Sequence, residues 1–315
     1  MRDLQKMRGN LFSATISSLF LLACLPLIVF LLLRTLPSDP ARIILGANAS
    51  QESVANLRTH LGLDRPWADQ LLDEYRHVGT LDFGKSPVTG RLILPESLAR
   101  FGVTLRIGMM SCLFALACSV LLCGLFYRYP ILRSLLLPFR LWLALPAFLS
   151  ATVLTLVLGA WVPWVSLAVG PAIERGEWSA FLIPASLSSI YSLFLMTRIL
   201  DERVTATVHA PSYRAERAAG LPSTHLFFRA AFRPSASAWL EAGVNQLALI
   251  VFTVMLVELL LSLPGIGSLL LEAVQRKDLP MLQVIILLNG SFFLLVRFVG
   301  ASAQRFLNPQ TAANA

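Results

Sequence analysis

Charged residues are scarce in this chain: only 14% of the 315 residues are Asp, Glu, Lys or Arg, whereas 56% are hydrophobic. The mean hydropathy of +0.69 lies far from the balance of a soluble domain. The length would allow two soluble domains, but long stretches contain no charge at all. We therefore interpret most of the length as membrane spans.

The sequence also lacks the motifs of a catalytic or metal site. It has no Gly-rich phosphate loop, and no acid–base pair or nucleophile triad can be assembled from the residues expected outside the membrane. The cysteines have neither CxxC spacing nor a nearby histidine, which is typical of apolar packing residues: Cys24, Cys112, Cys118 and Cys123. We expect no catalysis by this chain, no metal site and no bound cofactor.

Six charge-poor windows approach the roughly 20 residues that a helix needs to cross a hydrocarbon core about 30 Å thick. We expect spans at Leu11–Leu33, Ile107–Tyr127, about Leu135–Ala160, Trp178–Thr197, about Trp239–Leu263 and Leu279–Val296. The third should end near Trp161, because tryptophan favours the headgroup level and Pro163 ends a helix. The predicted fold class is all-α integral membrane.

Basic residues predict that both termini are cytoplasmic. Thirteen Lys and Arg fall in the segments expected inside, with only four acidic residues among them, whereas acidic residues outnumber basic ones outside. The net charge of +8 is explained by this asymmetry, because the basic residues flank apolar segments and form no nucleic-acid patch. We expect no nucleic-acid partner.

The predicted spans divide the chain into four parts. These are a cytoplasmic N-terminus with the first span (1–34), an outer segment (35–98), a transmembrane domain of five helices (99–306) and a C-terminal tail (307–315). In the outer segment the apolar spacing predicts two amphipathic helices, about Gln51–Leu61 and Pro66–Val78. Asp64 and Asp82 have no clustered oxygen ligands beside them, so we interpret them as solvated loop residues.

The transmembrane domain includes a cytoplasmic loop at 198–238 whose sequence predicts a helix–turn–helix at the membrane face. One helix, rich in Ala, Arg and Glu, starts at Ser212 and should stop at Gly220, because glycine caps helix ends. A second helix, Ser223–Phe232, begins with residues that favour the N-cap. Pro234 should then interrupt the chain before the fifth span.

Within this loop, Tyr213–Ala236 resembles the EAA loop of binding-protein-dependent permeases of ATP-binding-cassette (ABC) importers, in the form seen in dipeptide, oligopeptide and nickel permeases. That form has a helix ending in Lys-Gly-Leu and then an Arg-His-Ala-Leu-Arg-Asn pattern, which Gly220-Leu221 and residues 229–233 (RAAFR) match. Glu216, Ala219 and Pro234 depart from the family's Ala, Lys and Asn. Further motifs resemble the family at 61–66 (LGLDRP), 81–86 (LDFGKS), 264–267 (PGIG), 276–280 (RKDLP) and 307–309 (LNP).

The resemblance implies a type I ABC importer permease fold with six transmembrane helices. It implies that the chain forms half of a pore in the bacterial inner membrane, for peptides, nickel or metal chelates. The implied partners are a second homologous permease subunit, two cytoplasmic ATPase subunits that hold ATP and Mg, and a periplasmic or lipid-anchored solute-binding protein. ATP hydrolysis would belong to those ATPase subunits.

The resemblance also assigns candidate sites. The expected ATPase-docking residues are Tyr213, Arg214, Ala215, Glu216, Arg217, Gly220, Leu221, Arg229 and Arg233. The alternative for these is that they are ordinary flanking charges that orient the chain. The candidate pore or gate residues are Glu258, Pro264, Gly265 and Gly267.

Each candidate pore residue has a plainer interpretation. An ionisable group inside a span is costly and often functional, but Glu258 could instead snorkel to the outer interface, or pair with Arg106 or Arg297. The PGIG stretch could be a turn at the membrane exit. Two other protein classes also stay open: a secondary transporter or channel, and a membrane scaffold that transports nothing.

Overall fold

The computed structural model describes residues 17, 20–32, 40–45, 49–60, 62, 64–135, 142–162 and 164–307. Within these ranges the elements are helices and the only β pairing is an isolated bridge between Lys85 and Leu92. The elements are α2 (Pro40–Leu45), α3 (Gln51–His60), α4 (Trp67–Thr80), α5 (Ile93–Arg128), η1 (Pro130–Leu135), α7 (Ala147–Trp161), α8 (Trp164–Glu174), η2 (Trp178–Phe181), α9 (Leu182–Val208), α10 (Pro211–Ala218), α11 (Ser223–His225), η3 (Leu226–Phe232), α12 (Arg233–Leu261), α13 (Ile266–Gln275) and α14 (Leu279–Leu307). An apolar helix, Phe20–Leu32, precedes them.

Four helices in the described residues are long and apolar enough to cross a membrane: Ile93–Arg128, Trp178–Val208, Ser223–Leu261 and Leu279–Gly300. They contain the second, fourth, fifth and sixth predicted spans, whose helices are thereby confirmed. The first predicted span is described only in part, as the helix Phe20–Leu32, and the rest of its window lies outside the described residues.

The predicted course of the third span is wrong at its start. The helix in this window is α7, which begins at Ala147 rather than near Leu135 and has only 15 residues, or about 22 Å of helix. Pro146 precedes it with an extended backbone (φ −56°, ψ 145°), and the chain before it makes a turn from Trp142 to Leu145. The apolar composition concealed this break, because proline ends helices whatever the hydropathy around it. The predicted end at Trp161 is confirmed.

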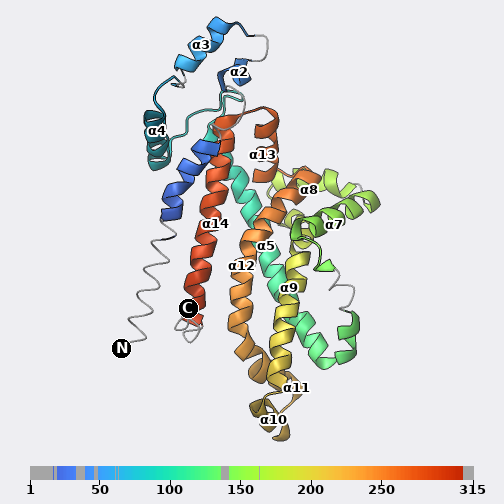
Figure 1. Cartoon of the computed structure of the whole chain (residues 1–315). Helices are drawn as coiled ribbons and strands as arrows, with labels where there is room; N and C mark the ends of the chain where they lie inside the picture. The colour runs from blue at the N-terminus through green and yellow to red at the C-terminus, as the bar shows by residue number, and fades with distance from the viewer. Residues whose placement is uncertain are drawn as a thin grey trace, which may run out of the picture. The chain divides into compact units, whose positions relative to one another are not determined.

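The chain divides into two compact units. The first contains the described parts of Thr104–Pro264 and Val296–Ala315, and the second those of Ser13–Val103 and Gly265–Leu295. Several helices of the first unit pack along their length, and Figure 1 shows α9 beside α12, with α10 and α11 at one end of the pair.

Small residues allow α5 and α12 to approach closely in the first unit. A Cβ atom built on Gly243 would lie 2.8 Å from the Leu116 side chain, and one on Gly108 would lie 3.0 Å from Val251. The thiol of Cys112 also lies 3.8 Å from the Gly243 carbonyl oxygen. Glycines at such contacts are typical of helices packed inside a membrane, where backbones come together over small side chains.

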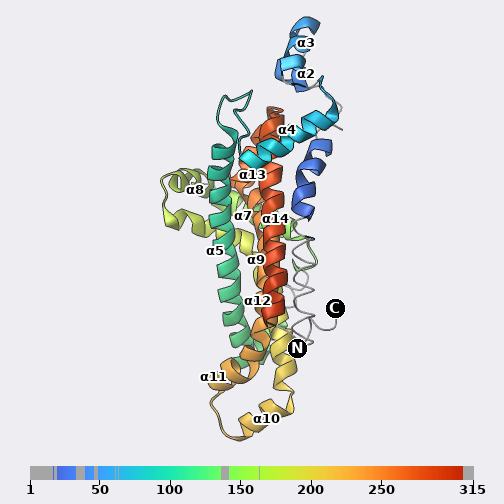
Figure 2. The same ribbon diagram turned by 90° about the vertical axis from the view of Figure 1, so that its left-hand side faces the viewer.

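The second unit contains α2, α3, α4, α13, the helix Phe20–Leu32 and the first part of α14. Leu25 packs against α14 at Gly290, where a Cβ atom would lie 2.9 Å from its methyl groups. The two predicted amphipathic helices are confirmed as α3 and α4. Figure 2 shows α4 lying across the ends of the helix Phe20–Leu32 and α14 rather than alongside them.

Candidate functional site

The predicted helix–turn–helix exists, and its turn is built as the glycine position indicated. Helix α10 begins with Pro211 in its first turn and is followed by Ala219 as its C-cap. Gly220 then adopts φ +77°, a left-handed conformation that favours glycine, and its N–H donates to the Arg217 carbonyl at 3.1 Å. Pro222 is extended and leads directly into α11.

The second arm of this hairpin continues without a break into the membrane helix, so the predicted interruption at Pro234 is wrong. Helix α11, the π-helical turn η3 and α12 form one helix from Ser223 to Leu261, with Pro234 in the first turn of α12. Proline removes a backbone donor and crowds the carbonyl four residues earlier. The wider π turn immediately before it accommodates this defect, so the helix continues.

A buried hydrophobic cluster fixes the hairpin to the rest of the first unit. This anchor cluster consists of Cys123, Leu200, Val204, Tyr213, Leu226, Phe227 and Ala231, from α5, α9, α10 and the second arm of the hairpin. The Tyr213 hydroxyl hydrogen-bonds the hydroxyl of Tyr127 on α5, and the ring of Tyr127 lies 5.3 Å from that of Phe227. The hairpin is therefore held from both arms, by aromatic packing and a partly buried hydrogen bond.

Aromatic contacts extend the anchor cluster along the second arm. The Phe232 ring lies 5.7 Å from Trp239, whose indole N–H donates to the Ser119 hydroxyl on α5 at 2.9 Å. A connector on the same side is also tied down, because the Arg133 guanidinium of η1 donates to Asp201 (2.9 Å) and to Thr205 (3.0 Å) on α9. These contacts bind the continuation of the second arm to α5, and the connector η1 to α9.

The expected docking residues differ in where their side chains lie. Tyr213 is only 4% exposed and contributes to the anchor cluster, so it faces away from any partner surface. Glu216 is half-buried, and its Oε2 atom is buried without a hydrogen-bond partner. The others are exposed: Arg214, Ala215, Arg217, Gly220, Leu221, Arg229 and Arg233. The hairpin therefore presents four arginines on its surface.

Glu258 lies inside the first unit and does not snorkel. It is completely buried, and its carboxylate Oε1 accepts a hydrogen bond from the Thr104 hydroxyl of α5 at 2.6 Å. The Glu258 carbonyl also accepts the backbone N–H groups of Ser262 and Leu263, which close the end of α12. The structure thus identifies Thr104 as a hydrogen-bond partner of Glu258.

The PGIG stretch follows α12: Pro264 and Gly265 form a bend, and Ile266 and Gly267 begin α13. Pro264 is half-buried. Gly265 is buried and precedes α13 with an extended backbone, and its carbonyl accepts the Ser268 hydroxyl at 2.8 Å. Gly267 is buried in the first turn of α13. A role of these residues in lining a pore stays a prediction.

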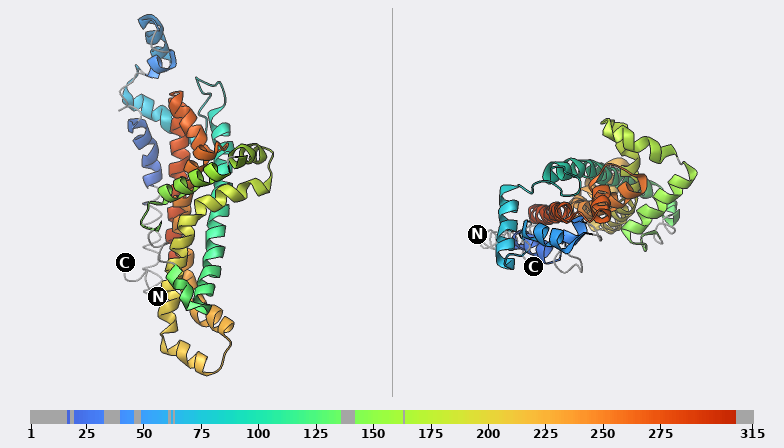
Figure 3. Two further views of the ribbon diagram at one scale, coloured as in Figure 1. Left: turned by 90° about the vertical axis from the view of Figure 1, so that its right-hand side faces the viewer. Right: turned by 90° about the horizontal axis from the view of Figure 1, so that it is seen from above.

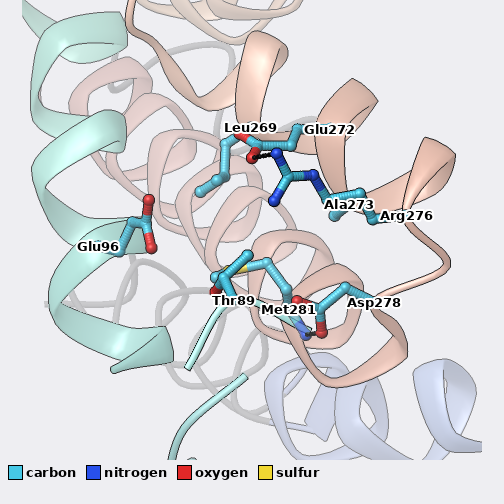
Figure 4. Close-up of a pocket in the computed structure, with 8 residues that line it drawn as sticks. All are labelled: Thr89, Glu96, Leu269, Glu272, Ala273, Arg276, Asp278 and Met281. Carbon is cyan, nitrogen blue, oxygen red and sulfur yellow. Dashed lines mark hydrogen bonds and ion pairs between the residues drawn. The ribbon is translucent and has the colours of Figure 1, made fainter. Parts of the chain in front are cut away.

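A polar pocket lies in the second unit between the start of α5, α13 and the start of α14. It is lined by Thr89, Glu96, Leu269, Glu272, Ala273, Arg276, Asp278 and Met281, whose side chains are drawn in Figure 4. Glu272 pairs with Arg276 at 3.1 Å, and Glu96 pairs with Arg91 at 2.8 Å. In the described part of the chain, no three His, Cys, Asp or Glu side chains are grouped so that they could hold a metal ion.

Asp278 joins two of the sequence motifs that are far apart in the chain. Its carboxylate accepts a hydrogen bond from the Ser86 hydroxyl, and it is only 2% exposed. Ser86 closes the LDFGKS stretch by accepting the N–H groups of Val88 and Thr89, while Asp278 caps the start of α14 through the Met281 N–H at 3.2 Å. The motif stretches 81–86 and 276–280 are therefore joined by one buried contact between Ser86 and Asp278, here called the latch.

Comparison with known proteins accounts for the hairpin and the motifs together. Residues 91–313 match the family described as "Binding-protein-dependent transport system inner membrane component", and residues 7–85 match the N-terminal family of the same membrane components. The chain belongs to this family. It is a permease subunit of an ABC importer, located in the inner membrane as a multi-pass protein, and ATP hydrolysis lies in separate subunits.

Curated relatives of this permease cover nearly its whole length. The glutathione transport system permease protein GsiC of Salmonella typhimurium is 26% identical over 286 residues, which is 90% of this chain and 92% of the relative. The protein of the same name from Escherichia coli strain K12 is 26% identical over 298 residues, or 93% and 94% of the two chains. The resemblance seen in the sequence motifs is thereby confirmed.

Some functional candidates of the permease could not be identified from its sequence. Tyr127 and Phe227 lie in or beside the anchor cluster, yet each is an aromatic residue near a span end, a position that tryptophan and tyrosine often take for contact with lipid. The sequence indicated Arg133 only as one of the basic residues that predict a cytoplasmic segment, and not as a partner of α9. Only the approach of α5, α9 and α10 in three dimensions shows what these side chains contact.

Proposed function

We propose that this permease forms half of the translocation pore of an importer for small peptides, and that its hairpin α10–η3 docks a cytoplasmic ATPase. The observation that carries the proposal is the combination of a buried anchor and an exposed basic surface in one capped hairpin. Basic residues that only set the orientation of the chain in the membrane would need no such anchor, because their effect depends on how many of them lie near the span ends. A rigidly held hairpin, in contrast, can transmit a movement of its partner to α5, α9 and α12.

In this proposal the exposed arginines position the hairpin on the ATPase, and the anchor cluster passes the motion inward. Arg214, Arg217, Arg229 and Arg233 would meet an acidic surface, since complementary charge fixes the register of an interface. Tyr213 acts from inside, through Tyr127. Closure of the ATPase subunits on ATP would then reorient the attached helices, a rigid-body step of the kind that gates other transporters.

A charge-reversal experiment tests the docking. We expect Arg217→Glu to reduce co-purification of the ATPase subunits and the uptake that they drive. Arg203→Glu is the matched control, because Arg203 is exposed on α9, outside the hairpin. This substitution makes the same change of charge in the same predicted cytoplasmic segment. Equal losses in both variants would mean that only the total positive charge matters, and would contradict docking by the hairpin.

The substrate proposal rests on the relatives. They are named for glutathione transport, and glutathione is a tripeptide, so a small peptide is favoured over nickel or a metal chelate within the range that the sequence motifs implied. Uptake into proteoliposomes that contain the whole importer and its solute-binding protein tests this. We expect glutathione or short peptides to be transported, and transport of nickel alone would contradict the peptide class.

The proposed assembly contains this chain, a second homologous permease, two ATPase subunits that hold ATP and Mg, and an external solute-binding protein. We propose six spans with both termini in the cytoplasm, supported by the bias of Lys and Arg toward the inside segments. Glu258 and the turn residues Pro264, Gly265 and Gly267 remain the candidate gate. Because Thr104 holds the Glu258 carboxylate, Thr104→Val should alter uptake if this carboxylate takes part in gating.

A further inference from the structure

Helix α4 has three faces of different chemistry, whereas a helix packed on a protein in water needs only two. Gln70 and Glu74 are buried, each with 9% of its surface exposed. Residues spaced four and three apart then form an apolar face, Ala68, Leu72 and Tyr75, and a polar face, Asp69, Asp73 and Arg76. Leu72 is 57% exposed, so the apolar face is not covered by the described part of the chain.

Large apolar side chains are also exposed at both ends of α4. Trp67 at its start and Leu81 just after its end are each 64% exposed. Two of the three charged groups of the polar face, in contrast, pair within the segment, because Asp73 binds Arg76 at 3.2 Å and also Arg65 at 2.6 Å. The unsatisfied feature of α4 is therefore apolar surface.

Contacts with α14 give the depth at which α4 lies. The Glu74 carboxyl is buried close enough to Gln283 for this side chain to lower its pKa. Gln283 lies four residues into the candidate span Leu279–Gly300, or about 6 Å along the helix. Amphipathic helices that lie in the membrane interface insert their apolar face by about 5–10 Å. The level of Gln283 thus matches an interfacial position.

A second contact places the apolar face itself beside membrane-embedded residues. The Tyr75 hydroxyl donates to the backbone carbonyl of Ala23 at 2.7 Å. Two residues further on, Leu25 packs against Gly290, close to the middle of the candidate span of α14. The helix that carries Ala23 also exposes apolar side chains along its length, among them Phe20 (66%) and Ile28 (55%). The face of α4 that includes Tyr75 is continuous with this surface.

We propose that α4 is an interfacial helix whose face Ala68–Leu72–Tyr75 inserts into the lipid bilayer. Figures 2 and 3 show α4 at a steep angle to α14 and to the helix Phe20–Leu32, as an element in the plane of the membrane would lie. Tryptophan and tyrosine are enriched at this level of the bilayer. Because Arg76 already pairs with Asp73, this basic group of α4 needs no anionic headgroup, and the helix fits a zwitterionic phospholipid surface.

Spin labels on opposite faces of α4 test the insertion. Leu72→Cys and Arg76→Cys would each be labelled with a nitroxide, in permease complexes whose four native cysteines are replaced by alanine, in phosphatidylcholine nanodiscs. Collisions with oxygen, which partitions into lipid, and with a water-soluble nickel chelate would be measured. We expect the ratio of oxygen to nickel accessibility at position 72 to exceed that at position 76 several-fold.

Equal, water-like ratios at both positions would overturn the proposal. Shielding of position 72 from both reagents would overturn it too, because that pattern indicates a covering protein partner. The wild-type complex provides a second test that needs no variant. In nanodiscs that contain a phosphatidylcholine with a photoreactive acyl chain, crosslinks should map to residues 67–80, and their absence there, with crosslinks present on α14, would contradict lipid contact.

Discussion

Removal of the Phe227 ring should release the hairpin from its anchor. Phe227 is 5% exposed and contacts the rings of Tyr127, Phe228 and Phe232 at 5.3, 5.0 and 6.2 Å between centroids. Phe→Ala substitutions at buried sites cost about 3–5 kcal/mol. If that loss falls on local opening of the anchor cluster, each 1.36 kcal/mol multiplies the open population tenfold, so the total increase is roughly 160- to 5000-fold.

Cys123 provides the assay, because it is fully buried in the same cluster. In Phe227→Ala, its modification by a maleimide, located by mass spectrometry, should accelerate by roughly the factor above. Phe228→Ala is the matched control, because this neighbouring ring is 57% exposed and its removal should change the rate little. Equal rates in the two variants would refute the assignment of Phe227 as the anchor.

Three further predictions concern other contacts. Gly243→Ala should lower thermal stability, by about 1–3 kcal/mol for overpacking against Leu116, whereas Gly159→Ala, which meets nothing within 4 Å, should not. Asp278→Ala should destabilise the latch by about 1–3 kcal/mol, because the Ser86 hydroxyl loses its acceptor. The unfolding temperature should fall in this variant but not in Asp82→Ala, which changes an exposed carboxylate. Burial raises the pKa of Glu74 by more than Gln283 and the charge of His77 lower it. The protonated carboxyl therefore stabilises the folded state fully below the unfolded pKa of about 4.5, and this stabilisation is lost as the pH rises through the raised pKa. Glu74→Gln should therefore flatten the pH dependence of thermal unfolding above pH 4.5, and an unchanged profile would contradict it.

Charge-free windows identified four of the membrane helices, because a span leaves a long apolar run whatever its packing. The same measure failed before α7, which begins only after Pro146 although the residues from Leu141 to Leu145 are also apolar. It also gave no warning that α11, η3 and α12 run together past Pro234, because a π turn depends on local geometry that composition does not encode.

The candidate site was predicted in outline and corrected in its side chains. Gly220 indicated the turn of the hairpin, since its left-handed backbone favours one residue type. Tyr213 was expected on the docking surface but is buried. Glu258 was a candidate pore or gate residue, with snorkelling to the interface as one alternative; it is buried and accepts a hydrogen bond from Thr104, and its role in a gate stays a prediction. Hydropathy shows that a segment is in the membrane, but which neighbour a side chain meets depends on contacts between elements far apart in the sequence.

The central claim is that the exposed face of the hairpin α10–η3 meets an ATPase subunit. A photoreactive amino acid at Arg217, in the assembled importer in native membranes, tests this most directly. Trp161 is the control position, because it is 84% exposed at the far end of α7. The account predicts a crosslink to the ATPase subunit from position 217 and none from position 161. Absence of that crosslink at 217, in complexes that still contain the ATPase, would contradict it.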